Sequence, residues 1–212
     1  MGDLLWQALK ETLIMVIPST ILAVIIGFIP AIILVLTDEN GLKPNKIIYK
    51  VLDFIVNILR SLPFIILMVV IIPLTKLIMG TSIGENAAIV PLTLASAPFI
   101  ARIIESALKE VDKGVIEAAK SFGATNMQII FKVMLKEAIP TIVSGITLSL
   151  ISIIGYSAMA GTIGAGGLGA LAVRYGYQRF QTDVMIVTVI VLIIIVQIIQ
   201  SLGNYLYNKL IK

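Results

Sequence analysis

The sequence predicts an all-α integral membrane protein with five membrane-spanning helices and an amphipathic cytoplasmic loop between the third and fourth. Only 13% of the 212 residues are charged, whereas about a quarter are charged in soluble domains. The mean hydropathy is +1.06, far above the soluble range. Five predominantly apolar runs are long enough to cross a bilayer, which takes about 20 residues. We therefore expect residues 1–212 to form a single transmembrane domain.

The first two spans are expected at residues 12–37 and 57–79. The first, "TLIMVIPSTILAVIIGFIPAIILVLT", is too long for a signal-peptide core and has no small-residue cleavage site, so it should remain as a helix. The second is centred on "SLPFIILMVVIIPLT". Its two cations, Arg60 and Lys76, can extend toward opposite membrane interfaces.

The remaining spans are expected at residues 86–108, 138–163 and 184–208. The third begins with the uncharged run "NAAIVPLTLASAPFIA" and continues as an amphipathic helix, while the fifth is the least ambiguous of the five. Membrane helices tolerate proline when neighbouring groups satisfy the freed carbonyls. The prolines within the expected spans include Pro18, Pro30, Pro63, Pro73, Pro91 and Pro98.

The distribution of basic residues predicts the orientation. The segments 38–60 and 102–137 and the tail after residue 208 hold 4, 6 and 2 Lys and Arg residues, against 4 in the remaining segments. Cytoplasmic loops carry the excess of basic residues. The amino terminus is therefore expected outside and the carboxyl terminus in the cytoplasm.

The composition excludes several kinds of chemistry. The chain has no cysteine and no histidine, so it cannot build a thiolate, a histidine base or an ordinary zinc site. No metal or cofactor is expected. No carboxylate lies in the apolar core of a span, which disfavours ion-coupled transport, and no phosphate-binding loop is present. Any uphill transport must draw its energy from another chain.

The segment 112–136 reads as two amphipathic helices that meet at a glycine. Val115, Ala118, Ala119 and Phe122 share the spacing of one helix face, and Gly123 ends that helix. Thr125 and Gln128 have the form of a capping box that opens a second helix. The pair could lie on anionic lipid or transmit force from a soluble partner.

The spacing in this segment resembles the EAA loop of the membrane subunits of bacterial ABC importers. "EAA" at 117–119 is followed by three residues, Gly123, nine residues and "VML" at 133–135. Lys136 stands where the family has proline. The resemblance implies that this cytoplasmic loop docks partner ATPase subunits, through Glu117, Ala118, Ala119, Lys120, Gly123 and Thr125.

Nearly the whole chain resembles the methionine-importer permeases, through "RSLPFIIL", "GTSIGENAAIVPLTLASAPFIAR", "GATNMQI" and "GYSAMAGTIGAGGLG". The resemblance implies a homodimer in the bacterial cytoplasmic membrane, two ATPase subunits that hydrolyse ATP, and an external lipoprotein that delivers the amino acid. The chain itself is then a transport subunit and not an enzyme. Importers of glycine betaine, phosphonate or another amino acid remain alternatives, as do an autonomous channel and a membrane scaffold. Because no span core offers a charge for a zwitterion, we expect selectivity to reside in the external protein.

Tyr156 and Met159 are the candidate gate and pathway residues. The small residues Gly155, Ala158, Ala160 and Gly161 around them would let two copies of the fourth span approach closely. Met159 lies 21 residues after Ala138, or about 30 Å along a helix, which places it toward the outer end of the span.

The glycine-rich turn "GAGGLG" follows the fourth span. It matches a dinucleotide-binding pattern by chance, because that pattern requires a preceding strand. A flexible turn at a helix end is one interpretation. The other is an external docking loop or pore-closing loop, formed by Gly164, Gly166, Gly167 and Gly169.

Overall fold

A computed structural model describes residues 2–211, which form helices and contain no strand. The α-helices are α1 (Gly2–Thr37), α2 (Lys46–Ser61), α3 (Phe64–Val70), α4 (Ile72–Met79), α5 (Glu85–Lys109), α6 (Lys113–Ser121), α7 (Asn126–Gln128), α8 (Leu135–Ala160), α9 (Gly167–Leu171) and α10 (Thr182–Ile211). Three π-helical turns complete the fold: η1 (Ile129–Met134), η2 (Gly161–Ala165) and η3 (Ala172–Tyr177).

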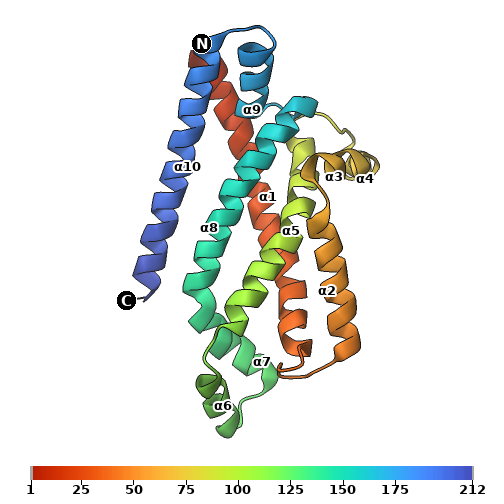
Figure 1. Ribbon diagram of the computed structural model, residues 1–212, viewed down its shortest axis with the longest axis vertical. Coiled ribbons are helices and arrows are strands. Elements are labelled where there is room, and N and C mark those ends of the chain that lie inside the picture. The colour runs from red at the N-terminus through yellow and green to blue at the C-terminus, as the bar shows by residue number, and fades with distance from the viewer. Residues whose placement is uncertain (1, 212) are drawn as a thin grey trace.

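The long helices run side by side, and the short helices lie at the two ends of the molecule (Figure 1). α1 packs most extensively on α5, which also contacts α8 and α2, and α10 lies against α8. α6 and α7 occupy one end, while α3, α4 and α9 occupy the other (Figure 1). The residues expected to dock the ATPase therefore lie far from the expected gate.

Four helical segments are long and apolar enough to cross a membrane, and α2 with α3 forms a fifth candidate that is bent by 102°. α5, α8 and α10 begin and end within three residues of the runs expected at 86–108, 138–163 and 184–208. α1 begins at Gly2, ten residues before the expected start at residue 12. The helix extends beyond the apolar run, and the carboxylate of Asp3 in its first turn stabilises this end by a favourable interaction with the helix dipole.

The expected second span, 57–79, does not form one helix. α2 begins at Lys46, and the chain breaks at Leu62, whose φ of −75° and ψ of 125° are extended. Proline disfavours helical backbone in the residue before it, so Pro63 causes the break. Asp53 made residues 46–56 look like a loop, yet Arg102 of α5 pairs with it at 2.6 Å and allows α2 to pack beside α5.

This correction moves Arg60 away from the cytoplasmic loop in which the basic residues were counted. α2 starts near the end of the molecule that carries α6 and rises toward α3 (Figure 1). Arg60 therefore lies near the far end of a membrane helix. The segments assigned to the cytoplasm still hold most of the basic residues.

Candidate functional site

The short helix α6 is defined by its sequence at both ends. Asp112 caps its start, where the carboxylate accepts hydrogen bonds from the backbone N–H groups of Gly114 and Val115 at 2.7 and 3.2 Å. At its end, Ala124 N–H donates to Ala119 C=O and Gly123 N–H donates to Lys120 C=O, as in a Schellman motif. Gly123 has a φ of +76°, and a Cβ added there would meet nothing within 4 Å. The glycine is required for its backbone conformation and not for space.

The predicted capping box at Thr125 and Gln128 is confirmed. Gln128 Oε1 accepts from the Thr125 N–H at 2.9 Å, and Thr125 Oγ1 accepts from the Gln128 N–H at 3.3 Å. The second helix does not end at Lys136, where the family has proline. It continues through η1 into α8 as one helical segment that passes Pro140.

The apolar residues of α6 lie on two faces of the helix and not on the single face that was expected. Ile116 and Ala119 pack on a core cluster built from α1, α5, η1 and α8. The exposed apolar residues of this segment are Val115, Ala118 and Phe122, and Phe122 is 92% exposed. Their spacing of three and four residues places them on one face. α6 thus anchors on the core with one side and presents an uncovered apolar face with the other.

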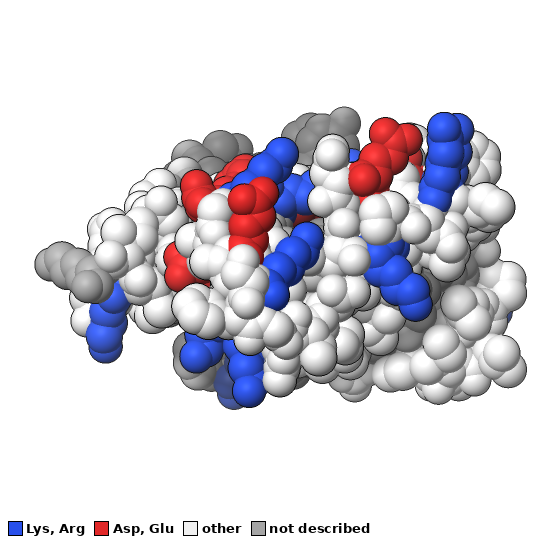
Figure 2. Space-filling model, turned by 90° about the horizontal axis from the view of Figure 1, so that it is seen from below, with Lys and Arg blue, Asp and Glu red and all other residues white. Residues whose placement is uncertain are grey.

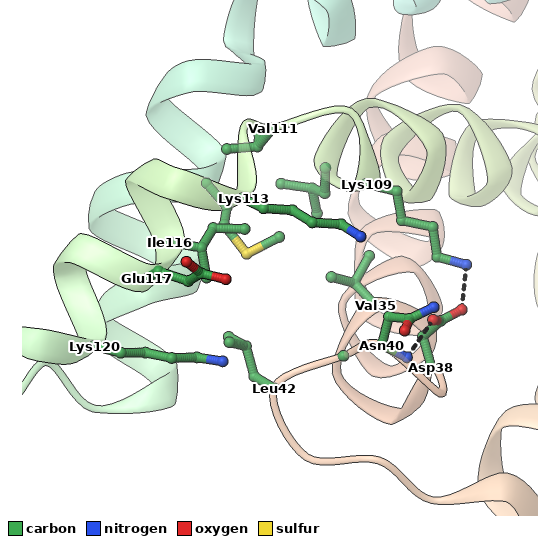
Figure 3. Close-up of a pocket in the computed structure, with 13 residues that line it drawn as sticks. Val35, Asp38, Asn40, Leu42, Lys109, Val111, Lys113, Ile116, Glu117 and Lys120 are labelled. Carbon is green, nitrogen blue, oxygen red and sulfur yellow. Dashed lines mark hydrogen bonds and ion pairs between the residues drawn. The ribbon is translucent and has the colours of Figure 1, made fainter.

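A cavity of about 330 Å³ separates α6 from the turn between α1 and α2. Figure 3 shows Lys113, Glu117 and Lys120 extending from α6 toward this turn, which contributes Asp38 and Leu42. Glu117 takes part in none of the ion pairs among residues 2–211. Viewed from this end, the molecule displays both basic and acidic side chains (Figure 2).

An ionic network that the sequence analysis missed connects α5 to α2 and to the α1–α2 turn. Glu105 is 2% exposed and accepts from Arg102 at 2.7 Å and from Lys109 at 2.8 Å. Arg102 also pairs with Asp53 of α2, and Lys109 pairs with Asp38 at 2.7 Å. The spacing of Arg102, Glu105 and Lys109 by three and four residues on one helix was the available signal.

Asp38 lies just beyond the end of α1 and remains ionised for a local reason. Its partial burial opposes the charged form, but the hydrogen bonds from Lys109 Nζ and the Asn40 N–H lower the pKa of Asp38 below its usual value. The turn is also held to the loop, because Asn126 Nδ2 donates to Leu42 C=O at 3.2 Å. The α1–α2 turn and the amphipathic loop therefore form one connected surface.

The candidate gate residues lie near the opposite end. Tyr156 stacks on Phe64 of α3 with ring centroids 4.8 Å apart. Met159 is 47% exposed. Among the small residues expected to face a second copy, Gly155 is exposed, whereas Ala160 and Gly161 are buried. They are buried because α9 folds back on α8, so that a Cβ on Gly161 would lie 2.5 Å from the Ala170 nitrogen.

The glycine-rich turn is fastened to α1. Gly167 N–H donates to Glu11 Oε2 at 2.7 Å, and Leu168 N–H donates to Thr12 Oγ1 at 2.9 Å. Gly167 and Gly169 are buried, and a Cβ on Gly169 would collide with the Ala158 backbone. These two glycines provide packing space and cannot face an external partner in this arrangement. Gly164 and Gly166 are partly exposed.

Comparison with known proteins gives consistent matches. The family of binding-protein-dependent transport system inner membrane components matches residues 23–212. The chain is 51% identical over 209 residues to the probable D-methionine transport system permease protein MetI of Vibrio cholerae, covering 99% of this chain and 93% of that protein. It is 48% identical over 208 residues to the methionine import system permease protein MetP of Bacillus subtilis, covering 98% and 94%.

Solved structures share the fold. A chain of the MetNI methionine ABC transporter, in a structure described as inward facing, matches with a TM-score of 0.97 and 45% identity, over 99% of this chain and 97% of that chain. A chain of an amino acid ABC transporter with histidines matches with a TM-score of 0.81 and 20% identity, over 98% and 94%, and shows similarity of fold alone.

Proposed function

Because the chain belongs to the family of binding-protein-dependent transport system inner membrane components, we propose that it is the permease subunit of an ATP-driven methionine importer. The methionine assignment is supported by relatives of about half-identical sequence that carry this function in their names. The chain is a transport component of the inner membrane, and ATP hydrolysis belongs to a partner chain.

The observation that carries the ATPase-docking role is the uncovered face of α6. Val115, Ala118 and Phe122 are exposed on one side of the helix, and Glu117 has no ionic partner among the described residues. An apolar patch with an unpaired charge is typical of a protein interface, where the patch buries area and the charge selects the partner. The core contacts of Ile116 and Ala119 would carry the motion of a docked ATPase to α1, α5 and α8.

A second copy of the chain would complete the pathway. Leu148, Gly155 and Met159 are exposed on α8 at spacings of seven and four residues, so they lie on one face. Two such faces can approach through Gly155 and bring the Met159 side chains together. An apolar pair at this depth can close the pathway by excluding water. Tyr156, held by Phe64, supports the wall behind it.

An external lipoprotein would deliver the solute at the end that carries α9. This places the amino terminus and the partly exposed Gly164 and Gly166 outside, with α6 and the carboxyl terminus in the cytoplasm. The basic residues of the α1–α2 turn and of the segment around α6 support this orientation.

The docking role is tested by co-purification with the ATPase. We expect Glu117→Ala and Gly123→Val each to reduce recovery of the ATPase at least fivefold. The first removes the unpaired charge, and the second forces a β-branched residue to a φ of +76°. Asp183→Ala is the matched control, because Asp183 is an exposed acid at the start of α10, at the far end of the molecule.

All three variants should insert into the membrane as the parent does. Normal recovery of the ATPase with both loop variants, together with normal methionine uptake, would remove the docking role of α6. Loss of recovery with Asp183→Ala would show that the assay reports folding instead of docking.

A further inference from the structure

Arg60 is a charged residue at membrane depth. It lies ten residues after Lys50, the last exposed charge before it on α2, or about 15 Å further along the helix, half of a bilayer core of about 30 Å. An ionisable group at this depth faces water or a partner and marks a functional site.

No acid among the described residues is placed to neutralise Arg60. Its guanidinium lies over the Phe99 ring, 5.9 Å from the centroid, and it is absent from the ion pairs among residues 2–211. Asp53 and Glu105 are occupied by Arg102. Glu110, which follows the last residue of α5, also lines the larger cavity, but it is eleven residues beyond Phe99, about 16 Å away along the helix axis.

Two cavities meet at Arg60 and Phe99. The larger, of about 490 Å³, follows α5 and α8 toward the cytoplasmic end and is lined by polar groups that include Ser106, Thr141 and Ser144. The smaller, of about 250 Å³, extends from Arg60 to Tyr156, and Leu59, Leu67 and Ala95 line it between these polar groups. Together they make a hollow within the size range of small-molecule sites.

We propose that Arg60 binds the carboxylate of the amino acid in transit, while the apolar side chain of the solute packs against Phe99 and the smaller cavity. A guanidinium pairs with a carboxylate through two parallel hydrogen bonds, and a thioether contacts aromatic rings favourably. The inference rests on the proposed function, because it takes the solute to be an amino acid. It gives the membrane subunit a selectivity of its own, which the sequence analysis assigned to the external protein alone.

Equilibrium binding to the purified permease–ATPase complex tests the site without the external protein. In phosphate-free dodecyl maltoside, we expect radiolabelled methionine to bind and norleucine to compete. Methioninamide, which keeps the ammonium and thioether but lacks the carboxylate, should compete at least tenfold more weakly. Arg60→Gln should weaken methionine binding at least tenfold. Arg60→Lys should weaken binding less than Arg60→Gln does, because an ammonium keeps the charge but cannot form the two parallel hydrogen bonds. Lys50→Gln is the matched control on the same helix and should bind as the parent does.

Three results overturn the site: no binding by the parent complex, unchanged binding by Arg60→Gln, or equal competition by methioninamide. A lipid phosphate could offer the same anion, so the measurement is repeated in phospholipid nanodiscs. Binding that persists there supports the amino acid, and binding lost there assigns Arg60 to lipid and overturns the proposal. Uptake by the complete importer in liposomes separates the Arg60 site from the proposed importer function. If the parent importer takes up methionine but Arg60→Gln binds methionine as the parent does, the site is wrong and the proposed function stands.

Discussion

Glu105 is the buried centre of an ionic network near the end of α5. Its side chain is 2% exposed and accepts from two cations, Arg102 and Lys109. Each cation also reaches an acid on another element, Asp53 of α2 and Asp38 of the α1–α2 turn. Glu105 therefore sets the positions of two side chains that hold α2 and the turn against α5.

Replacing Glu105 with glutamine should reduce stability strongly. Removal of one charge from a buried ionic network leaves its partners uncompensated and costs about 3 kcal/mol. The measurement is denaturant unfolding of the purified subunit in detergent. Glu110→Gln removes the neighbouring exposed acid, which makes no ion pair among the described residues, and should cost less than about 0.5 kcal/mol. Equal stability of the two variants would show that the network adds nothing to the fold.

At the scale of the elements, the close packing of α1 on α5 requires a small residue at Gly27. A Cβ on Gly27 would lie 2.5 Å from the Ala97 carbonyl oxygen and 3.0 Å from the Ala101 nitrogen, so the two backbones are in contact there. Small residues permit such close packing of membrane helices.

Gly27→Val should therefore separate α1 from α5 and destabilise the subunit by about 3 kcal/mol, at the upper end for overpacked cores. Ile25→Val is the control, because Ile25 is 57% exposed on the same helix and its change introduces the same residue on the outer face. Thermal unfolding in detergent compares them. A Gly27→Val protein as stable as the control would contradict the close contact.

The sequence predicted those elements whose apolar runs are uninterrupted, such as α10 and most of α8. It could not predict α2, because the charge of Asp53 is neutralised by Arg102, which is 49 residues away. Pairing over such a distance leaves no local pattern. The 102° bend had a local signal in Pro63, but proline is common inside membrane helices, as Pro18 in α1 illustrates.

The backbone conformation of the candidate site could be predicted from the sequence, but the face of α6 that packs on the core could not. Gly123 and the capping box at Thr125 act through neighbouring residues, so their conformations followed from the sequence. Which face of α6 is covered depends on contacts with η1 and α1, and periodicity alone did not separate Ala119 from Ala118. The burial of Gly169 likewise required α9 to fold back on α8.

At the scale of the whole molecule, the orientation in the membrane can be measured directly. The sequence contains no cysteine, so single cysteines at Lys43, Asn126 and Gln178 can be probed with an impermeant thiol reagent. All three positions are exposed. We expect only the variant at Gln178 to react from outside in intact cells. Reaction at Asn126 under the same conditions would reverse the orientation and place α6 where no ATPase could reach it.

The assembly of two copies gives the second prediction at this scale. Met159→Cys should form a crosslink between subunits without nucleotide and less of it with ATP trapped, because closing the motor should separate the paired gates. Ile190→Cys on α10 is the control, since its side chain is 49% exposed on a helix of which little is covered. It should not crosslink in either state. Absence of a Met159→Cys crosslink, with passive leak and uptake unchanged in Met159→Ala, would make Met159 a packing residue.

The hydrogen bonds from Gly167 and Leu168 to Glu11 and Thr12 join residues 156 positions apart in the chain. A ribosome that adds about 5 to 20 residues per second needs about 8 to 30 s to travel that distance. α1 is therefore synthesised long before Gly167 and Leu168, whose backbone N–H groups donate to Glu11 and Thr12 of α1. The first turns of α1 therefore gain these two hydrogen bonds only when about four-fifths of the chain has been made, so this end of the helix is held late in synthesis.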